Sequence, residues 1–510
     1  MSLEKYAWKQ NGRSRHALNK ASGLLLGLLL INAPPLAAES IDDLFGGPPS
    51  GAKKPASKAA PPEDKPSITV PSKSPEPQPV SKPTADSAPP APVKALAEAE
   101  KPQPTAAKPK VTGFLQNDLA YTYAGTKHWS RFNNTLDLAS QGRTEGGVGW
   151  KLGGRVSYDP VYDLGDYYPG AVRKDQRFEA TIREAYTDFA AGDWEFRLGR
   201  QHVVWGEMVG LFFADVVSAK DLRQSVLPDF DMIRIPQWAA RAEYFRGDFH
   251  AEGVWVPYMS YDDIGKPGAE FYPFNPVAVA GFQTVIANEE KPNKLKDGAY
   301  GLRLSYLTGG WDLSGFYYTS NDAAAAFART TTLLPTPIIT YRPIHKRIQQ
   351  VGATLGKDLG PMVLKAEAIY TKDKLFSTTN AAYADGLVKQ NIFDYIVGLE
   401  WSFPQETRFN AQVFQRRFFN HDANIVPSKT ESGFSVLFST QALHPKLEPE
   451  LLLVRSLNRN DWLAQFKLTW KMDGNWRLAT GVDVFEGPST GLFGAYDNKD
   501  RVYTEVRYSF

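Results

Sequence analysis

The chain of 510 residues contains no cysteine, which excludes disulfide bonds and metal sites built on thiolates. Its formal net charge is only +2, so the charge balance gives no reason to expect nucleic acid as a partner. The His-Glu-x-x-His signature of zinc hydrolases is also missing, and the seven histidines are scattered. We therefore predict a protein that is not an enzyme, with no catalytic residues, no metal site and no cofactor.

Long apolar runs are scarce as well. One run, GLLLGLLLI from Gly23 to Ile31, follows several basic residues and precedes the small residues of PPLAAES. It is well under the roughly 20 residues that a helix needs to span a bilayer. This pattern predicts a secretory signal peptide over residues 1–38, cut near Ala38, with a short membrane anchor as the alternative. No later stretch resembles a transmembrane helix.

Residues 39–110 consist largely of Pro, Ala, Lys and Ser. Such a segment cannot bury enough apolar surface to fold, and its prolines favour extended conformers. We predict a disordered periplasmic tether. Its lysines outnumber its acids, so a contact with the cell wall or with an inner-membrane transporter is the alternative to a plain solvated linker.

From Val111 onward the sequence is rich in aromatic residues, which make up 13% of the whole chain, while the mean hydropathy is still −0.37. Strand-like runs with alternating apolar and polar residues come in pairs joined by short polar turns, and longer stretches separate the pairs. Outer-membrane barrels show this alternation of short and long connections. We predict an all-β fold over residues 111–510, a transmembrane antiparallel β-barrel of about 18 strands, with 16 as the alternative count and a water-soluble sandwich as the competing fold.

The last ten residues, RVYTEVRYSF, separate into an apolar series that includes Val502 and Phe510 and a polar series that includes Glu505 and Arg507. A cation on the lipid face costs roughly 2–4 kcal/mol at mid-bilayer, so the charged series is expected in the lumen and the apolar series against outer-membrane lipid. The predicted lumen-facing residues are Lys151, Arg155, Arg183, Arg197, Arg241, Glu243, Arg303, Lys365, Glu367, Lys467, Lys471, Glu505 and Arg507. The final Phe510 resembles the C-terminal signal that the barrel-assembly machinery recognises.

One long connection, residues 205–236, is too apolar for a loop in solvent and also dense in charges. A loop that folds into the lumen meets both demands, and an external cap is the alternative. As an inward-folded constriction or plug, it would act through Trp205, Gly206, Glu207, Phe212, Phe213, Asp215, Lys220, Asp221, Arg223, Asp229, Asp231 and Arg234.

The run GRQHVVWGE, from Gly199 to Glu207, followed by Asp221 and Leu222, resembles a motif of proteobacterial outer-membrane proteins catalogued as domain of unknown function 1302. That motif is Gly-x-Gln, then Trp-Gly-Glu, then Asp-Leu, and the family usually has Asn-Pro where this chain has Ala219-Lys220. The resemblance would cover residues from about 111 to 510, without the Pro-rich tether. It implies a porin-like protein linked to export or uptake of hydrophobic compounds.

We therefore expect a porin-like channel or conduit that moves small or hydrophobic compounds across the bacterial outer membrane, constricted or gated by the 205–236 loop. A structural barrel tethered to the cell wall or to an inner-membrane export complex is the first alternative. A barrel enzyme is the second.

Overall fold

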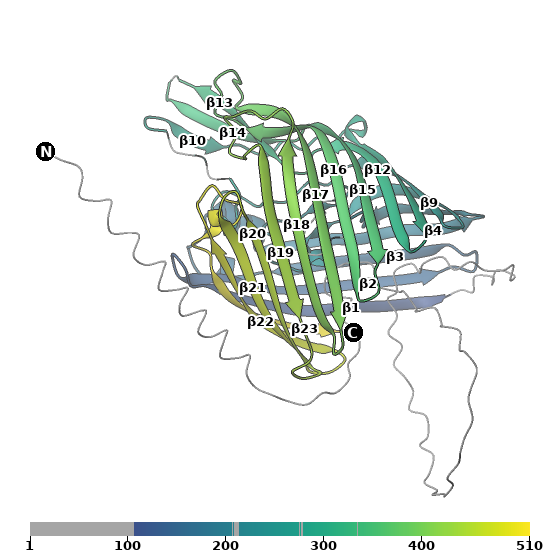
Figure 1. Ribbon diagram of the computed structural model, residues 1–510. Coiled ribbons are helices and arrows are strands. Elements are labelled where there is room, and N and C mark those ends of the chain that lie inside the picture. The colour runs from purple at the N-terminus through teal and green to yellow at the C-terminus, as the bar shows by residue number, and fades with distance from the viewer. Residues whose placement is uncertain (1–106, 207, 209–213, 275, 277–278, 334) are drawn as a thin grey trace, which may run out of the picture.

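The computed structural model describes residues 107–510, apart from 207, 209–213, 275, 277–278 and 334. Predictions that concern residues 1–106, the signal peptide and nearly all of the tether, lie outside this range. The described chain forms one sheet of 18 strands (Figure 1). The strands are β1 (Ala107–Thr122), β2 (His128–Arg143), β3 (Gly149–Tyr158), β4 (Phe178–Ala191), β5 (Trp194–Gln201), β8 (Gln237–Arg246), β9 (Phe249–Tyr258), β11 (Ala299–Thr308), β12 (Trp311–Asn321), β15 (Arg347–Asp358), β16 (Met362–Ser377), β17 (Leu387–Phe403), β18 (Thr407–Phe418), β19 (Thr430–Ser439), β20 (Leu447–Ser456), β21 (Asp461–Lys471), β22 (Trp476–Glu486) and β23 (Arg501–Ser509).

Each of these strands pairs antiparallel with its neighbours in chain order. The last strand, β23, pairs with β1 from Arg501 opposite Thr122 to Ser509 opposite Phe114, which closes the sheet into a barrel. Closure leaves the 18-stranded sheet without a free first or last strand. The predicted antiparallel barrel of about 18 strands is confirmed.

The two ends of the barrel differ. One end, called here the turn end, carries the start of β1, the C-terminus and tight connections such as 192–193, 247–248 and 309–310, where glycines adopt positive φ. The other end, the loop end, carries long connections, among them 159–177, 202–236, 259–298 and 322–346.

The strand β1 begins at Ala107, before the predicted start at Val111, because β2 extends to Arg143 and offers a partner for residues 107–110.

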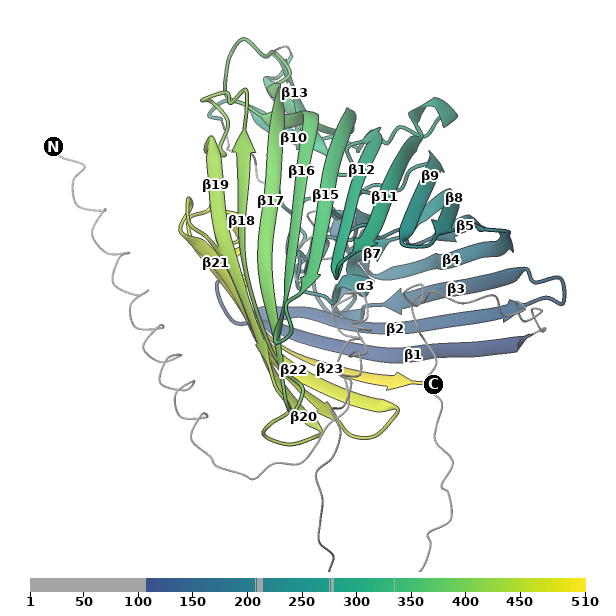
Figure 2. The ribbon, with the colours of Figure 1, turned by 45° about the vertical axis from the view of Figure 1, so that its right-hand side comes forward.

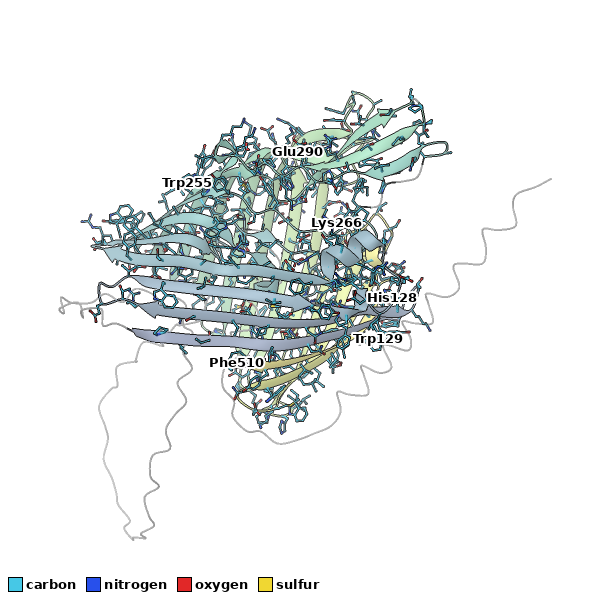
Figure 3. The ribbon with its side chains drawn as sticks, turned by 180° about the vertical axis from the view of Figure 1, so that it is seen from behind. His128, Trp129, Trp255, Lys266, Glu290 and Phe510 are labelled. Atoms are coloured by element: carbon cyan, nitrogen blue, oxygen red, sulfur yellow. The ribbon has the colours of Figure 1, made fainter. Side chains whose placement is uncertain are left out.

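The alternating faces divide as expected for a barrel with an apolar outside. On β11, Tyr300, Leu302, Leu304 and Tyr306 are each between 44% and 55% exposed, while Arg303 between them donates to Ser314. Trp129, Trp255 and Phe510 also lie on the outside of the wall (Figure 3). Within the described residues, no helix is both long and apolar enough to cross a membrane.

Small elements occupy the loop end. A separate three-stranded sheet of β10 (Gln283–Ile286), β14 (Ile338–Ile344) and β13 (Ala326–Thr332) stands beyond the barrel rim, at the top of Figure 1. The sequence analysis did not predict this sheet. Short helices, η1 (Pro160–Tyr162), α2 (Gly170–Gln176), η2 (Leu295–Asp297) and η3 (Gly494–Tyr496), lie in the connections.

The connection between β5 and β8 holds three further elements. These are β6 (Ala219–Lys220), α3 (Phe230–Ile233) and β7 (Arg234–Ile235), and β6 pairs with β7. Figure 2 shows α3 and β7 within the ring of strands. This connection, residues 202–236, is called the inner loop below.

Candidate functional site in the barrel lumen

The inner loop meets the wall first at β16. The carboxylate of Glu367 accepts hydrogen bonds from the backbone N–H groups of Met208, at 3.1 Å, and Ala214, at 2.8 Å. Glu367 is only 2% exposed. Two backbone donors that a loop in solvent would give to water are therefore satisfied by one side chain of the wall.

Beside this contact, Trp205 provides the apolar anchor of the inner loop. Its side chain is 0% exposed and its ring centroid lies 5.3 Å from that of Phe316 and 5.8 Å from that of Tyr318, both on β12. Val203, Ala214 and Val217 belong to the same buried cluster. Burial of such a ring supplies roughly 1.5–3 kcal/mol, which favours the inward position of the loop.

The inner loop meets the wall a second time at β21–β23. Asp229 lies 3.4 Å from the Nζ of Lys467 and 3.8 Å from the guanidinium of Arg477. Burial alone would raise the pKa of Asp229, but these two cations outweigh it and hold that pKa below its ordinary value. Arg501 donates to the side chain of Gln224 at 2.9 Å. The inner loop therefore crosses the lumen between two walls.

Charged pairs also hold the inner loop to itself and to its neighbours. Arg234 pairs with Asp215 at 2.8 Å, and both side chains are less than 10% exposed. Arg223 contacts Asp221 on the inner loop, Glu179 on β4 and Asp263 on the connection after β9. A buried pair that lost one partner would leave an uncompensated charge, so these pairs oppose movement of the loop.

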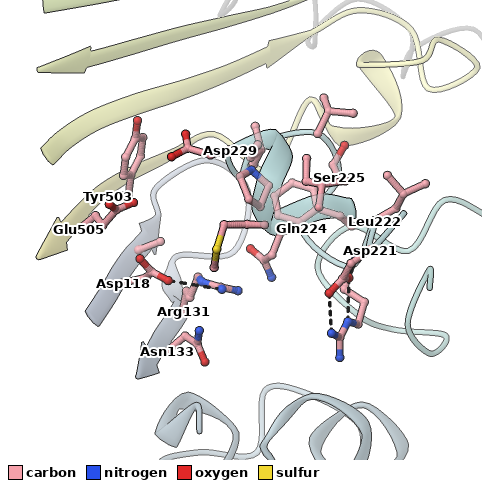
Figure 4. Close-up of a pocket in the computed structure, with 18 of the residues that line it drawn as sticks. Asp118, Arg131, Asn133, Asp221, Leu222, Gln224, Ser225, Asp229, Tyr503 and Glu505 are labelled. Carbon is pink, nitrogen blue, oxygen red and sulfur yellow. Dashed lines mark hydrogen bonds and ion pairs between the residues drawn. The ribbon is translucent and has the colours of Figure 1, made fainter. Parts of the chain in front are cut away.

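A cavity of about 470 Å³ remains between the inner loop and the wall of β1–β4 and β20–β23. In Figure 4, Asp118, Arg131 and Asn133 project from the wall strands, while Gln224 and Ser225 belong to the inner loop. The cationic lining residues are Arg131, Arg155, Arg183, Arg200, Arg223, Lys467 and Arg501. The acidic lining residues are Asp118, Asp159, Glu179, Asp221, Asp229, Asp263, Glu450 and Glu505. Seven cations against eight carboxylates make the lining of this cavity charged but nearly balanced.

The predicted lumen residues contact neighbouring side chains of the barrel wall or the inner loop. Most form ion pairs across neighbouring strands: Lys151 with Glu184, Arg155 with Asp137, Arg197 with Asp188, Arg241 with Glu252, Lys365 with Glu400, Lys467 with Glu450, Lys471 with Glu448, and Glu505 with Arg477. Arg241 also pairs with Glu243 on its own strand, β8. Arg183 donates to the carbonyl of Asp231, and the guanidinium of Arg507 lies 3.6 Å from the ring centroid of Phe114. Only some of them, such as Arg155, Arg183 and Lys467, line the cavity.

The predicted inner-loop residues divide in a similar way. Asp215, Lys220, Asp221, Arg223, Asp229, Asp231 and Arg234 make polar contacts within the lumen or within the loop. Glu207, Phe212 and Phe213 lie outside the described residues. Two glycines of the resemblance motif lie where a side chain would collide with neighbouring backbone. Gly199 has a φ of +128°, and a Cβ there would lie 2.1 Å from the carbonyl oxygen of Ala185. A Cβ on Gly206 would lie 2.9 Å from the N of Asp215.

Sequence reasoning missed several cavity residues, among them Arg131, Asp118 and Arg200. Asp118 follows the period-2 pattern of β1, which could have found it, whereas Arg131 lies beside an irregularity of the β1–β2 ladder between Ala120 and Tyr121. The pattern could not have found Arg200. It assigns Arg200 to the same face of β5 as Leu198, which is 46% exposed on the outside of the barrel. Within the described residues, no group of three or more His, Asp or Glu side chains is placed to hold a metal ion.

Comparison with known proteins gives one family and several similar folds. The family model described as protein of unknown function (DUF1302) matches residues 73–510, which confirms the resemblance carried by the Gly199–Glu207 run. The match begins before the expected residue 111, inside the Pro-rich segment. No curated protein matches.

Among solved structures, OccAB1 of Acinetobacter baumannii is 9% identical, with a TM-score of 0.50 over 79% of this chain and 96% of that one. OccAB4 of the same organism is 10% identical, with a TM-score of 0.49 over 80% and 100%. OccK8 (OprE) of Pseudomonas aeruginosa is 13% identical, with a TM-score of 0.48 over 79% and 98%. At these identities the likeness to OccAB1 concerns the fold.

Proposed function

The chain belongs to the family described as protein of unknown function (DUF1302), and from that premise we propose that it is an outer-membrane channel whose passage is narrowed by the inner loop. A closed antiparallel barrel with an even number of strands, an apolar outside and short turns at one end is the architecture of outer-membrane proteins. A barrel of this size holds an aqueous channel unless something folds into it.

The observation that carries the proposal is the double attachment of the inner loop. It is held to β16 through Glu367 and to β21–β23 through Asp229 and Gln224, and the cavity of about 470 Å³ is left beside it. That cavity is in the size range of small-molecule sites, of roughly 300–1,000 Å³. The channel would therefore pass small solutes one at a time.

The nearly balanced lining argues against a strong preference for simple ions of either sign. A ring of like charge sets the selectivity of a pore, and here most cations already have a carboxylate partner. The apolar residues Leu222, Val226 and Leu227 also line the cavity. These two features together support small or partly hydrophobic compounds as cargo, and the inner loop as the part that constricts or gates their path.

Planar-bilayer conductance of the refolded barrel tests this function, with and without residues 207–235. We expect a small conductance from the intact protein and a several-fold larger one after the deletion. Removal of residues 328–342, the tip of the β13–β14 hairpin outside the barrel, is the matched control and should change nothing.

Equal conductance in the intact and deleted proteins would show that the inner loop is not a constriction. Silence of both, with folding verified by circular dichroism and by heat-dependent mobility on a gel, would overturn the channel and favour a structural role for the barrel.

A further inference from the structure

The wall of the barrel is incomplete beside β4. The ladder between β4 and β5 runs from Ala191 opposite Trp194 to Ala185 opposite Arg200, and there it stops. The strand β5 ends at Gln201, where the chain turns into the lumen, while β4 continues to Phe178. Among the residues that the structure describes, residues 178–184 therefore pair with β3 on one side and with no strand on the other.

Two arginines stand at this open edge. Arg183 is the extra residue of a β-bulge, because Gly153 lies opposite Glu184 and Gly154 lies opposite Ile182. Its guanidinium donates to the carbonyl of Asp231, at 2.9 Å, so α3 of the inner loop stands behind the edge. The Nε of Arg200 donates to the carbonyl of Ile182 at 2.6 Å, in the place of a missing neighbouring strand.

The position of Arg200 shows that the edge connects the two sides of the wall. Its partner across the β5–β8 ladder is Trp238, which is 43% exposed on the outside of the barrel. Side chains directly opposite one another in a sheet share a face. Arg200 nevertheless lines the lumen cavity, so its side chain passes from the outer face toward the inside at the place where β5 ends.

An apolar groove lies on the outer face next to the same edge. Its volume is about 350 Å³, its rim is formed by Leu136, Leu138, Val156 and Ile182, and Gly154 and Ala180 lie between them. Leu138, Val156 and Ile182 are between 40% and 52% exposed. Two further lining residues, Arg155 and Thr181, also line the lumen cavity. The groove and the cavity are thus separated by the backbone of β3 and β4 alone.

We propose that this edge is a lateral portal, through which an anionic amphiphile passes between the surrounding lipid and the lumen cavity. The proposal deepens the channel function and rests on it. The amphiphile would lie with its apolar chain in the groove and its anionic head at Arg183 and Arg200. Its path would run around the unpaired edge of residues 178–184, with α3 as the part that moves aside.

The two arginines at the open edge of β4 support an amphiphile with an anionic head group. Within the described part of the chain, neither Arg183 nor Arg200 has a carboxylate within 4 Å, whereas Arg155 is paired with Asp137. A guanidinium near hydrocarbon gains most from an anion that it can bind with two parallel hydrogen bonds, as a carboxylate allows. The groove supplies the other half of the recognition, since each buried methylene contributes to affinity.

Photolabelling of the full mature protein in phospholipid vesicles tests the portal. The probes are lauric acid and dodecanol, each with a diazirine near the end of the chain, and the labelled residues are mapped by mass spectrometry. We expect lauric acid to label residues around Ile182 and Val156 in preference to the rest of the lipid-facing belt.

Two variants sharpen the test. Gly154→Leu combined with Ala180→Phe fills the groove, and a Cβ at Gly154 meets nothing closer than 3.5 Å, so the wall can accept it. Loss of contact with two methylenes should lower labelling at Ile182 about tenfold. Gly315→Leu, at another glycine of the wall with room for a Cβ, is the matched control and should label like the parent. Arg200→Gln should lower labelling by lauric acid and leave labelling by dodecanol unchanged.

Even labelling around the whole belt, or labelling that the filled groove leaves intact, would overturn the portal. If Arg200→Gln lowered labelling by lauric acid and by dodecanol equally, the proposal that the edge recognises an anionic head group would be overturned. Ionic conductance is measured on the same preparations, and it reports on the channel alone: a conducting barrel without preferred labelling keeps the channel and rejects the portal. A barrel that does not conduct ions but is labelled mainly at the groove would contradict the channel function, and the groove would then be a lipid-binding site.

Discussion

Glu367 shows how one side chain can decide where a long loop lies. Its two oxygens accept from the backbone N–H groups of Met208 and Ala214, so one side chain of β16 binds the inner loop at two points. The carboxylate replaces the water that these two N–H groups would otherwise bind. Removal of an acceptor from a buried donor costs about 1–3 kcal/mol, so the contact is large enough to govern a local equilibrium.

We predict that Glu367→Ala loosens the inner loop and raises the mean conductance, with open events about tenfold more frequent. Single-channel recording measures both quantities. Glu400→Gln is the control, because Glu400 is a lumen carboxylate that pairs with Lys365 and Arg408 and not with the inner loop. Identical recordings from the parent and Glu367→Ala would show that the contact does not hold the loop.

Asp500, just before β23 at the loop end, is predicted to make the local structure depend on pH. Burial, with further contributions from Asp497, Glu486 and Asp483, raises the pKa of this carboxyl from 3.8 to about 7, although the N–H of Phe485 acts against the rise. A raised pKa means that the folded state binds the proton more tightly than the unfolded state. Its stabilising contribution is therefore full below pH 3.8 and is lost as the pH rises to about 7.

Thermal unfolding between pH 4 and pH 8 checks this prediction. The parent should lose stability up to about pH 7 and then level off, and Asp500→Asn should flatten the profile. Asp248→Asn, at an exposed turn, should keep the profile of the parent. A parent profile that rises over this range would contradict the assignment to Asp500.

At the scale of elements, Phe510 takes part in the pairing that closes the barrel. Phe510 and Gly113 exchange two backbone hydrogen bonds, each 2.9 Å long, and so extend the β1–β23 ladder by one residue. The ring of Phe510 is 46% exposed on the outside. The last residue therefore contributes to closure through its backbone and leaves its side chain available to a partner.

We predict that deletion of Phe510 reduces assembly in cells severalfold and leaves refolding in detergent nearly unchanged, since most of the β1–β23 ladder remains. Heat-dependent mobility on a gel measures the folded fraction in both cases. Phe510→Ala, which keeps the two backbone bonds, separates the side chain from the ladder. If both variants assemble normally in cells, the residue is not read by the barrel-assembly machinery.

At the scale of the whole molecule, the barrel closes on itself within residues 107–510. Every barrel strand already has two neighbours within residues 107–510. We predict that removal of residues 39–106 leaves the folded fraction and the conductance of the refolded barrel within error of the parent. Chemical cross-linking to cell-wall fragments, measured with and without this segment, tests its proposed role as a tether; equal cross-linking would reject that role.

The sequence could predict those features of the fold that depend on interactions between residues close together in the chain. The strand count and the division of faces depend on a period of two and on turn residues, which are local, so alternation such as that around Arg303 was sufficient. The prediction of an inward-folded loop rested on apolar and charged residues that stand together in residues 205–236, which is also local information.

Only the tertiary structure decided which partners these residues meet. The bulge at Arg183 shifts the register of β4 against β3, and no local pattern reveals a register between strands. The early end of β5, the passage of Arg200 to the inside, the contact of Glu367 with two loop amides and the extra sheet of β10, β13 and β14 all join residues far apart in the chain. The sequence by itself determined a closed barrel with an apolar outside, because that outcome follows from short-range periodicity and the cost of charge in lipid. The shape of the cavity and the open edge of the wall required the three-dimensional closure that brings β4, β5 and the inner loop together.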